Sequence, residues 1–211
     1  DRIPVRYGET NTASAMAFGF DPDLSTWSPF HGAAYAVIEA VAKIVAVGGR
    51  ADQVRLTLQE YFERLGTDPN KWGKPFAALL GALRAQHELG IPAIGGKDSM
   101  SGTFNEIDVP PTLVSFAVDV ASVKDIITPE LKAAGNRLVL LTVKRDGDLL
   151  PDYEDLKAQY RALTEDIKAK RVLSAYVLER HGAAEAVTKM ALGNGLGVKF
   201  ADSVSEETLF A

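Results

Sequence analysis

The sequence predicts a mixed α+β protein, because helical and strand patterns both occur along its 211 residues. The stretch Phe30–Val47 is largely apolar and carries only two charged side chains, as a buried helix does. Val54–Phe62 instead alternates apolar and polar residues with the period of two that is typical of a strand. Thr112–Val120 and Arg137–Val143 are two further strand candidates. The chain is therefore expected to form a sheet that is packed against helices.

The first helix has clear start and stop signals. Before it, Asp1–Ser28 is rich in Gly, Thr, Asn, Asp and Pro and is expected to be extended and looped. Ser28 followed by Pro29 is a capping residue followed by a first-turn proline, and Gly48-Gly49 ends the helix. Three apolar residues of the opening segment alternate and are expected in the core: Met16, Phe18 and Phe20.

A second helix is predicted over Pro75–Glu88, after a polar turn at Asp68–Lys74. Its apolar face repeats at three and four residues. That face consists of Phe76, Leu79, Leu80 and Leu83. A short apolar run, Ile91–Ile94, then leads as a strand into a glycine-rich polar loop.

The second half of the chain is predicted to be a separate, incomplete domain. We place a boundary near Gly135, so that residues 1–135 form one domain and residues 136–211 the other. After the strand Arg137–Val143, helical patterns follow at Tyr153–Lys170, Val172–Glu179 and Ala183–Leu192. The end of the sequence, Thr208–Phe210, is expected to begin a strand. One strand cannot cover these helices, which suggests that part of the sheet is missing.

Composition excludes several classes of function. The net charge of −5 and the pI near 5.3 give no general attraction to nucleic acid or to an anionic membrane surface. No apolar run reaches the roughly 20 residues that a membrane-spanning helix needs. The sequence contains no cysteine, which excludes a thiol nucleophile and suits the reducing cytoplasm. An anionic ligand would therefore need a local binding site.

Gly95-Gly96-Lys97-Asp98-Ser99 is the candidate for such a site. Glycines allow backbone N–H groups to approach an anion closely, and a neighbouring lysine adds positive charge. The aspartate could hold Mg²⁺ that bridges phosphate oxygens. The run is not a Walker A loop, because Ile91 and Asp98 stand where that motif needs Gly and Ser or Thr. A tight turn with solvated charges is the alternative explanation.

Two positions on the first helix are further candidates. Glu39 and Lys43 are four residues apart and share a helix face, where they could form a simple ion pair or present a carboxylate to a metal ion. His31 lies in the first turn, where its ring could contact a ligand or could be an ordinary polar residue.

Several motifs together resemble the phosphoribosylformylglycinamidine synthase family. The most specific is Gly95-Gly96-Lys97-Asp98-Ser99-Met100, which is similar to the family's Gly-Lys-Asp-Ser signature. The resemblance extends over nearly the whole chain and is closest to the large, multidomain form of the enzyme. The other matching segments are Trp27–Ala34, the helix with Glu39, Gln59–Phe62, Trp72–Phe76 and Met190–Gly195.

The resemblance implies a fold, a reaction and partners. The family's synthetase core contains two copies of an α+β module shared with aminoimidazole ribonucleotide synthetase, whose N-terminal halves pair through their sheets. This chain is similar to the second copy, with a truncated C-terminal half. ATP would phosphorylate formylglycinamide ribonucleotide, and ammonia from a separate glutaminase domain would displace the phosphate. The implied partners are the first core copy, the glutaminase domain and nucleotide substrates, with a homodimer through the N-terminal sheet as a further arrangement.

The resemblance also implies roles for individual residues. Gly96, Lys97, Asp98 and Ser99 would lie near nucleotide phosphate and metal, and Glu39 would bind Mg²⁺. Two departures weaken the metal assignment. Lys43 stands where the family often has Asn or Asp, and Arg180-His181-Gly182 stands in place of Asp-Gly-Gly. We therefore predict weak or absent Mg²⁺ binding at Glu39, with Asp98 as the remaining candidate. A degenerate nucleotide-binding module without chemistry of its own, or another ligase of the superfamily, are the alternatives.

Overall fold

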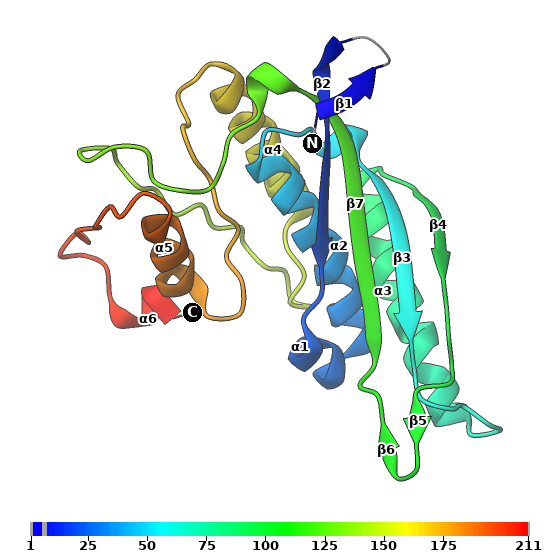
Figure 1. Cartoon of the computed structure of the whole chain (residues 1–211). Coiled ribbons are helices and arrows are strands. Elements are labelled where there is room, and N and C mark those ends of the chain that lie inside the picture. Colours follow the sequence, from blue (N-terminus) through cyan, green and yellow to red (C-terminus); the bar gives the residue numbers. More distant parts are fainter. Residues whose placement is uncertain (1, 6–7, 211) are drawn as a thin grey trace.

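The computed structural model of the chain describes residues 2–5 and 8–210, with side chains from residue 8 onward. Helices and strands are mixed, as predicted (Figure 1). The strands are β1 Arg2–Val5, β2 Gly8–Gly19, β3 Arg55–Tyr61, β4 Ala93–Lys97, β5 Thr103–Phe104, β6 Ile107–Asp108 and β7 Thr112–Ser122. The helices are α1 Pro22–Trp27, α2 Pro29–Ala46, α3 Pro69–Leu89, α4 Tyr153–Lys168, α5 Gly182–Leu192 and α6 Glu206–Phe210, with short 3₁₀ turns at Ala51–Gln53 and Val123–Asp125.

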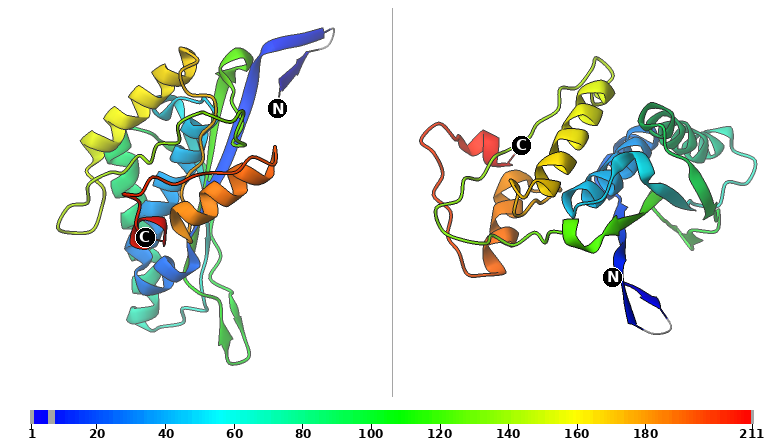
Figure 2. Two further views of the ribbon diagram at one scale, coloured as in Figure 1. Left: turned by 90° about the vertical axis from the view of Figure 1, so that its left-hand side faces the viewer. Right: turned by 90° about the horizontal axis from the view of Figure 1, so that it is seen from above.

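Within the described residues, the main sheet has five strands in the order β1-β2-β7-β3-β4, and helices cover one of its faces (Figure 2). β7 pairs antiparallel with both β2 and β3, whereas β3 and β4 are parallel. A parallel pair needs a crossover, and α3 provides it. Parallel strands end at the same edge, so the carboxyl ends of β3 and β4 lie side by side.

Helix α2 forms the centre of the core, and its predicted signals are confirmed. Ser28 is the N-cap, and its hydroxyl oxygen accepts a hydrogen bond from the backbone N–H of His31. Gly48 follows the helix with φ of 102°, a left-handed conformation that favours glycine. Eleven residues of α2 are buried, because one side meets the sheet and another meets α3. Several are alanines, which allow these close contacts.

The prediction for the second helix is wrong at its start. Asp68–Lys74 is not a turn, because α3 begins at Pro69 with Asp68 as its N-cap. The Asp68 carboxylate accepts a hydrogen bond of 2.9 Å from the backbone N–H of Asn70. The signal that marks α2, a capping residue followed by proline, therefore also marks α3, and Pro75 lies inside the helix.

The apolar residues predicted on this helix form an exposed stripe rather than a core face. Small residues such as Ala78, Ala82 and Ala85 are buried instead. The periodicity indicated that these apolar residues share one face of α3, but it did not indicate which face of the helix the rest of the chain covers. The exposed side chains are Phe76, Leu79, Leu80 and Leu83.

The open face of the sheet is also apolar. Met16 and Phe18, which were expected in the core, are 75% and 55% exposed. They lie on the face of β2 that no helix covers, while Ala13 and Ala15 on the opposite face are buried. The expectation failed because the larger side chains of this strand point away from the helices. Phe18 lies opposite Phe116 of β7, with ring centroids 6.4 Å apart.

The second half of the chain contains less regular structure than expected. Arg137–Val143 is not a strand, and Val172–Glu179 is not a helix. Among the described residues no strand pairs with 137–143, and strand propensity without a hydrogen-bonded neighbour does not make a strand. Residues 208–210 belong to helix α6 instead of beginning a strand. Helices α4 and α5 are confirmed, and the domain boundary near Gly135 stays a prediction.

Candidate phosphate and cation site

A hollow of about 190 Å³ lies where β3 and β4 end, beside α3. Its lining residues come from these three elements and the turn that follows β4. They are Leu58 and Glu60 of β3, Leu79 of α3, Gly96 and Lys97 of β4, and Asp98. The carboxyl ends of strands are where open α/β sheets place ligands. The sequence motif and the hollow therefore coincide.

The glycines of the motif belong to β4 rather than to a loop. Gly95, Gly96 and Lys97 pair in parallel with Thr57, Leu58 and Gln59. β4 is the edge strand of the described sheet, so alternate backbone N–H groups point outward without a strand partner. A Cβ at Gly96 would lie 2.4 Å from the carbonyl oxygen of Leu58, whereas a Cβ at Gly95 would meet nothing within 4 Å. Gly96 is thus needed for the fold, and Gly95 leaves the surface open.

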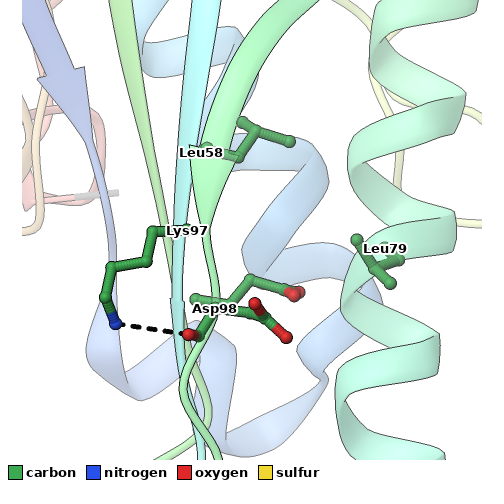
Figure 3. A pocket seen from close by; sticks show the side chains of 6 residues that line it. Leu58, Leu79, Lys97 and Asp98 are labelled. Atoms are coloured by element: carbon green, nitrogen blue, oxygen red, sulfur yellow. Dashed lines mark hydrogen bonds between the residues drawn. The ribbon is translucent and has the colours of Figure 1, made fainter.

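Lys97 and Asp98 point to opposite sides of the strand (Figure 3). The Asp98 carboxylate extends towards Leu79 of α3, while the Lys97 side chain lies on the other side of β4. The Lys97 amine donates a hydrogen bond of 3.3 Å to the backbone carbonyl of Asp98. Successive side chains alternate along a strand, which explains the separation. A ligand on the helix side of the sheet therefore meets the carboxylate and not the ammonium group.

Glu60 is a functional candidate that the sequence reading missed. Its side chain lies on the same face of β3 as Leu56 and Leu58, and the residue is only 6% exposed. Its Oε1 atom is buried and has no hydrogen-bond partner. Burial, together with the negative charge of Asp98, raises the pKa of Glu60 to about 7. The available signal was an acidic residue at a position where the alternation of β3 calls for an apolar one.

Ser99 and His31 have structural partners. The Ser99 carbonyl accepts a hydrogen bond of 2.9 Å from the N–H of Phe62, and its hydroxyl lies 2.9 Å from that of Ser101. The Nε2 atom of His31 lies 2.7 Å from the carbonyl oxygen of Asp148, and its Nδ1 atom lies 2.8 Å from the Ser28 hydroxyl. Because a carbonyl only accepts, Nε2 carries the proton. His31 does not line the hollow.

Glu39 is held by one cation, Lys43, and by a backbone N–H group, and not by an arrangement suited to a metal ion. Its Oε1 atom lies 2.6 Å from the Lys43 ammonium, and its Oε2 atom accepts a hydrogen bond of 3.1 Å from the N–H of Phe20. Lys43 also contacts Glu179 at 2.8 Å. Burial disfavours ionisation of Glu179, yet hydrogen bonds from Lys43 and Lys189 outweigh it and lower its pKa to about 2. The predicted proximity of Lys43 to Glu39 is confirmed.

The other position at which a cation replaces an expected acceptor is Arg180. Its guanidinium group pairs with the carboxylate of Asp23 in the first turn of α1. Within residues 8–210, no group of three or more His, Asp or Glu side chains is arranged to hold a metal ion. Among the described helices, none has the length and apolar character required to cross a membrane. Asp98 and Glu60 are thus the remaining acidic candidates.

Comparison with solved structures places this geometry in a known fold, although no family model matches the sequence. Thermotoga maritima PurL complexed with AMPPCP aligns with a TM-score of 0.60 and 20% identity, covering 85% of this chain and 29% of that one. Phosphoribosylformylglycinamidine synthase II from the same organism aligns with a TM-score of 0.56 and 18% identity, covering 84% and 28%.

A structure of a different protein also aligns. AaThiL complexed with AMPPCP and TMP gives a TM-score of 0.50 and 13% identity, covering 92% of this chain and 63% of that one. The present chain thus spans less than a third of the length of the PurL chains. The chain is a mixed helix-and-sheet protein that has, over about four fifths of its length, the fold of the PurL structures.

Proposed function

We propose that this chain is part of an ATP-dependent carbon–nitrogen ligase that resembles phosphoribosylformylglycinamidine synthase and acts in purine synthesis in the cytoplasm. The observation that carries the proposal is the position of the Gly95–Ser99 motif at the carboxyl end of the edge strand β4. The similar PurL structure binds AMPPCP, an ATP analogue, which supports a nucleotide at this fold. The reaction would be the amidation of formylglycinamide ribonucleotide.

The phosphate end of the nucleotide would lie against the outer edge of β4. There the backbone N–H groups are open, Gly95 presents no side chain, and Lys97 supplies a positive charge. The helix side of the same strand is less suitable for an anion, because Glu60 and Asp98 repel it. A volume of about 190 Å³ is also below the roughly 300 Å³ at which small-molecule sites begin. The base and sugar would therefore lie outside the hollow.

The proposed ligase would need partners. Because the chain has no cysteine, the glutaminase of the proposed ligase would be a separate domain. The first core copy of the family would be a second partner. A second copy of the N-terminal sheet, from either source, would cover the apolar open face of β2 and β7. The reason to expect such a cover is that large exposed apolar patches mark interaction surfaces. The side chains concerned are Met16, Phe18, Phe116 and Val120.

A second candidate function is a degenerate nucleotide-binding module within the same enzyme. The contact between Lys43 and Glu39 favours it, because a lysine occupies the carboxylate that relatives are expected to use for Mg²⁺. In that case the chain binds nucleotide without turnover. A different ATP-using enzyme of the superfamily is a third candidate, since AaThiL with AMPPCP and TMP has a similar fold.

Calorimetric titration with ATP and Mg²⁺ tests the proposal. We expect Lys97→Ala and Gly95→Val to lose the binding signal, because the first removes the charge and the second fills the approach to β4. Gly147→Ala is the control, since a Cβ there also meets nothing within 4 Å. Unchanged binding in both site variants would place the nucleotide elsewhere. If the chain, reconstituted with its partner domains, binds ATP but does not hydrolyse it, that result would favour the degenerate nucleotide-binding module.

A further inference from the structure

A second hollow, of about 290 Å³, lies near the start of β3, away from the Gly95–Ser99 motif at the end of β4. Its walls are the C-terminal end of α3, one face of α4 and the 3₁₀ turn Ala51–Gln53, which precedes β3. Leu79 lines the first hollow and Leu89 lines this one, so the two are about 15 Å apart along α3. This second space, the α4 hollow, is therefore separate from the site described above.

The α4 hollow is basic, although the chain as a whole is acidic. Four of its lining residues are basic and two are acidic, which gives a local charge of +2, whereas the whole chain carries −5. Three of the basic residues belong to α4 and share the face that lines the hollow. A local excess of positive charge attracts anions, in contrast to the rest of the surface. The basic residues are Arg50, Lys157, Arg161 and Lys168, and the acidic ones are Asp52 and Glu165.

Arg161 is the free cation of the α4 hollow. Two of the other cations are neutralised within the lining: Arg50 donates hydrogen bonds of 3.1 and 2.7 Å to the Asp52 carboxylate, and the Lys168 ammonium lies 3.3 Å from Glu165. Within residues 8–210, the Arg161 side chain has neither an ion pair nor a hydrogen bond. Hydrogen bonds from Arg50 lower the pKa of Asp52, and the charge of Arg161 lowers it further. The guanidinium group is thus near the hollow with all of its donors available.

Lys157 lies one helical turn before Arg161, and its partner is outside the hollow. The Lys157 ammonium lies 2.6 Å from the carboxylate of Glu154, whose side chain is 82% exposed. An ion pair at such an exposed position is weak, so the ammonium is free to turn towards a ligand. Side chains four residues apart on a helix are neighbours, and Lys157 and Arg161 can therefore contact the same anionic group.

From this arrangement we infer that the α4 hollow binds a small phosphate monoester, whose phosphate group is held by Arg161 and Lys157. A guanidinium group matches the geometry of phosphate oxygens with two parallel N–H donors. A phosphate monoester carries about −1.5 to −2 charges at pH 7, which balances the local charge of +2. The organic part would lie against Leu89 and Tyr160, which line the same hollow. The volume of about 290 Å³ is close to the roughly 300 Å³ at which small-molecule sites begin.

Titration of the ¹⁵N-labelled chain with phenyl phosphate, followed by NMR, tests the inference. We expect the amide signals of residues 50–52 and 157–168 to shift, and the affinity to fall by about tenfold or more in Arg161→Gln. Lys157→Gln should weaken binding as well and serves as the second variant. Arg64→Gln is the matched control, because Arg64 is also exposed and without an ion pair among the described residues, but does not line the hollow. Inorganic phosphate should shift the same signals with lower affinity, since it has no apolar part.

Three results would overturn this site: no shifts at millimolar phenyl phosphate, equal weakening in Arg161→Gln and Arg64→Gln, or binding of the dicarboxylate succinate as tight as that of phenyl phosphate. The last would show that the hollow selects charge and not phosphate. The inference does not depend on the proposed ligase function, and the Lys97→Ala variant separates the two. Shifts at residues 157–168 that persist in Lys97→Ala support the α4 hollow, whereas shifts that are lost there would assign the phosphate to β4.

Discussion

The Lys43 ammonium lies 2.6 Å from Oε1 of Glu39, and each of its three hydrogen atoms has an acceptor. The other two acceptors are Oε1 of Glu179, at 2.8 Å, and the carbonyl oxygen of Phe18, at 3.2 Å. One lysine thus joins α2 to β2 and to the segment before α5. Because an ammonium has three donors, no hydrogen-bonding capacity remains unused.

We predict that Lys43→Asn converts this contact into a weak cation site. The substitution leaves Glu39 and Glu179 without the charge between them, which should lower the free energy of unfolding by about 1–3 kcal/mol. Added Mg²⁺ should raise the melting temperature of Lys43→Asn by more than it raises that of the wild type. Combining it with Arg180→Asp should increase the effect. Lys43→Met, which provides no oxygen ligand, serves as the control, and an equal response to Mg²⁺ in both variants would contradict the prediction.

Glu63 should make stability depend on acid pH. Hydrogen bonds from Lys71 and Lys74 lower its pKa from 4.5 to about 2 in the folded chain. A lowered pKa contributes stability above the unfolded value of 4.5, and this contribution is lost as the pH falls towards 2. Urea unfolding across this range should show a gap between the wild type and Glu63→Gln that narrows on acidification. A gap that is constant with pH would show that the two lysines do not act on the ionised carboxylate.

Two glycines of α3 test different features of the helix: Gly73 tests where it begins, and Gly81 tests how closely it packs against α2. Gly73 lies in its second turn with open space around it, so Gly73→Ala should raise the free energy of unfolding by about 0.5–1 kcal/mol. At Gly81 a Cβ would lie 1.9 Å from the carbonyl oxygen of Phe30, so Gly81→Ala should destabilise by about 1–3 kcal/mol. Chemical denaturation measures both. Destabilisation by Gly73→Ala would indicate that residues 69–74 are not helical.

The open face of the sheet should make the chain self-associate. We expect sedimentation equilibrium to show association of the wild type that is weakened by Phe116→Lys, since Phe116 lies opposite Phe18 in the centre of that face. Phe104→Lys is the control, because Phe104 is 75% exposed but lies on the separate β5–β6 hairpin. A wild type that stays monomeric at high concentration, or equal effects of both substitutions, would count against this surface.

The sequence predicted those elements whose signals are local. Helix α2 was identified from Ser28-Pro29 and Gly48-Gly49, and strand β3 from its alternation. The strand prediction for Arg137–Val143 was wrong because a strand needs a hydrogen-bonded neighbour, and local propensity carries no information about that neighbour. The long strand β2 was missed since its Gly- and Thr-rich composition suggested a loop.

The candidate site was predicted in part. The motif Gly95–Ser99 was predicted to be a loop after a strand, whereas Gly95, Gly96 and Lys97 belong to β4 itself. Its residues were also treated as one surface. Glu60 could have been found, because it continues the inward-facing positions of β3, where Leu56 is buried and Leu58 is half-buried. Its proximity to Asp98 could not, since it depends on the parallel pairing of β3 with β4 across the intervening helix. The exposure of apolar faces was likewise undetermined, because periodicity does not specify what covers a face.

The alternation along β4 gives the four adjacent residues 95–98 two separate environments. The Lys97 side chain lies on one side of β4, whereas the Asp98 carboxylate extends from the other side towards α3 (Figure 3). Substitutions at neighbouring positions should therefore produce unrelated defects, one in recognition at the outer surface and one in the interior hollow. A single-residue insertion that shifted the register of β4 would exchange the two sets of side chains. It would therefore impair the function of both sides of the sheet.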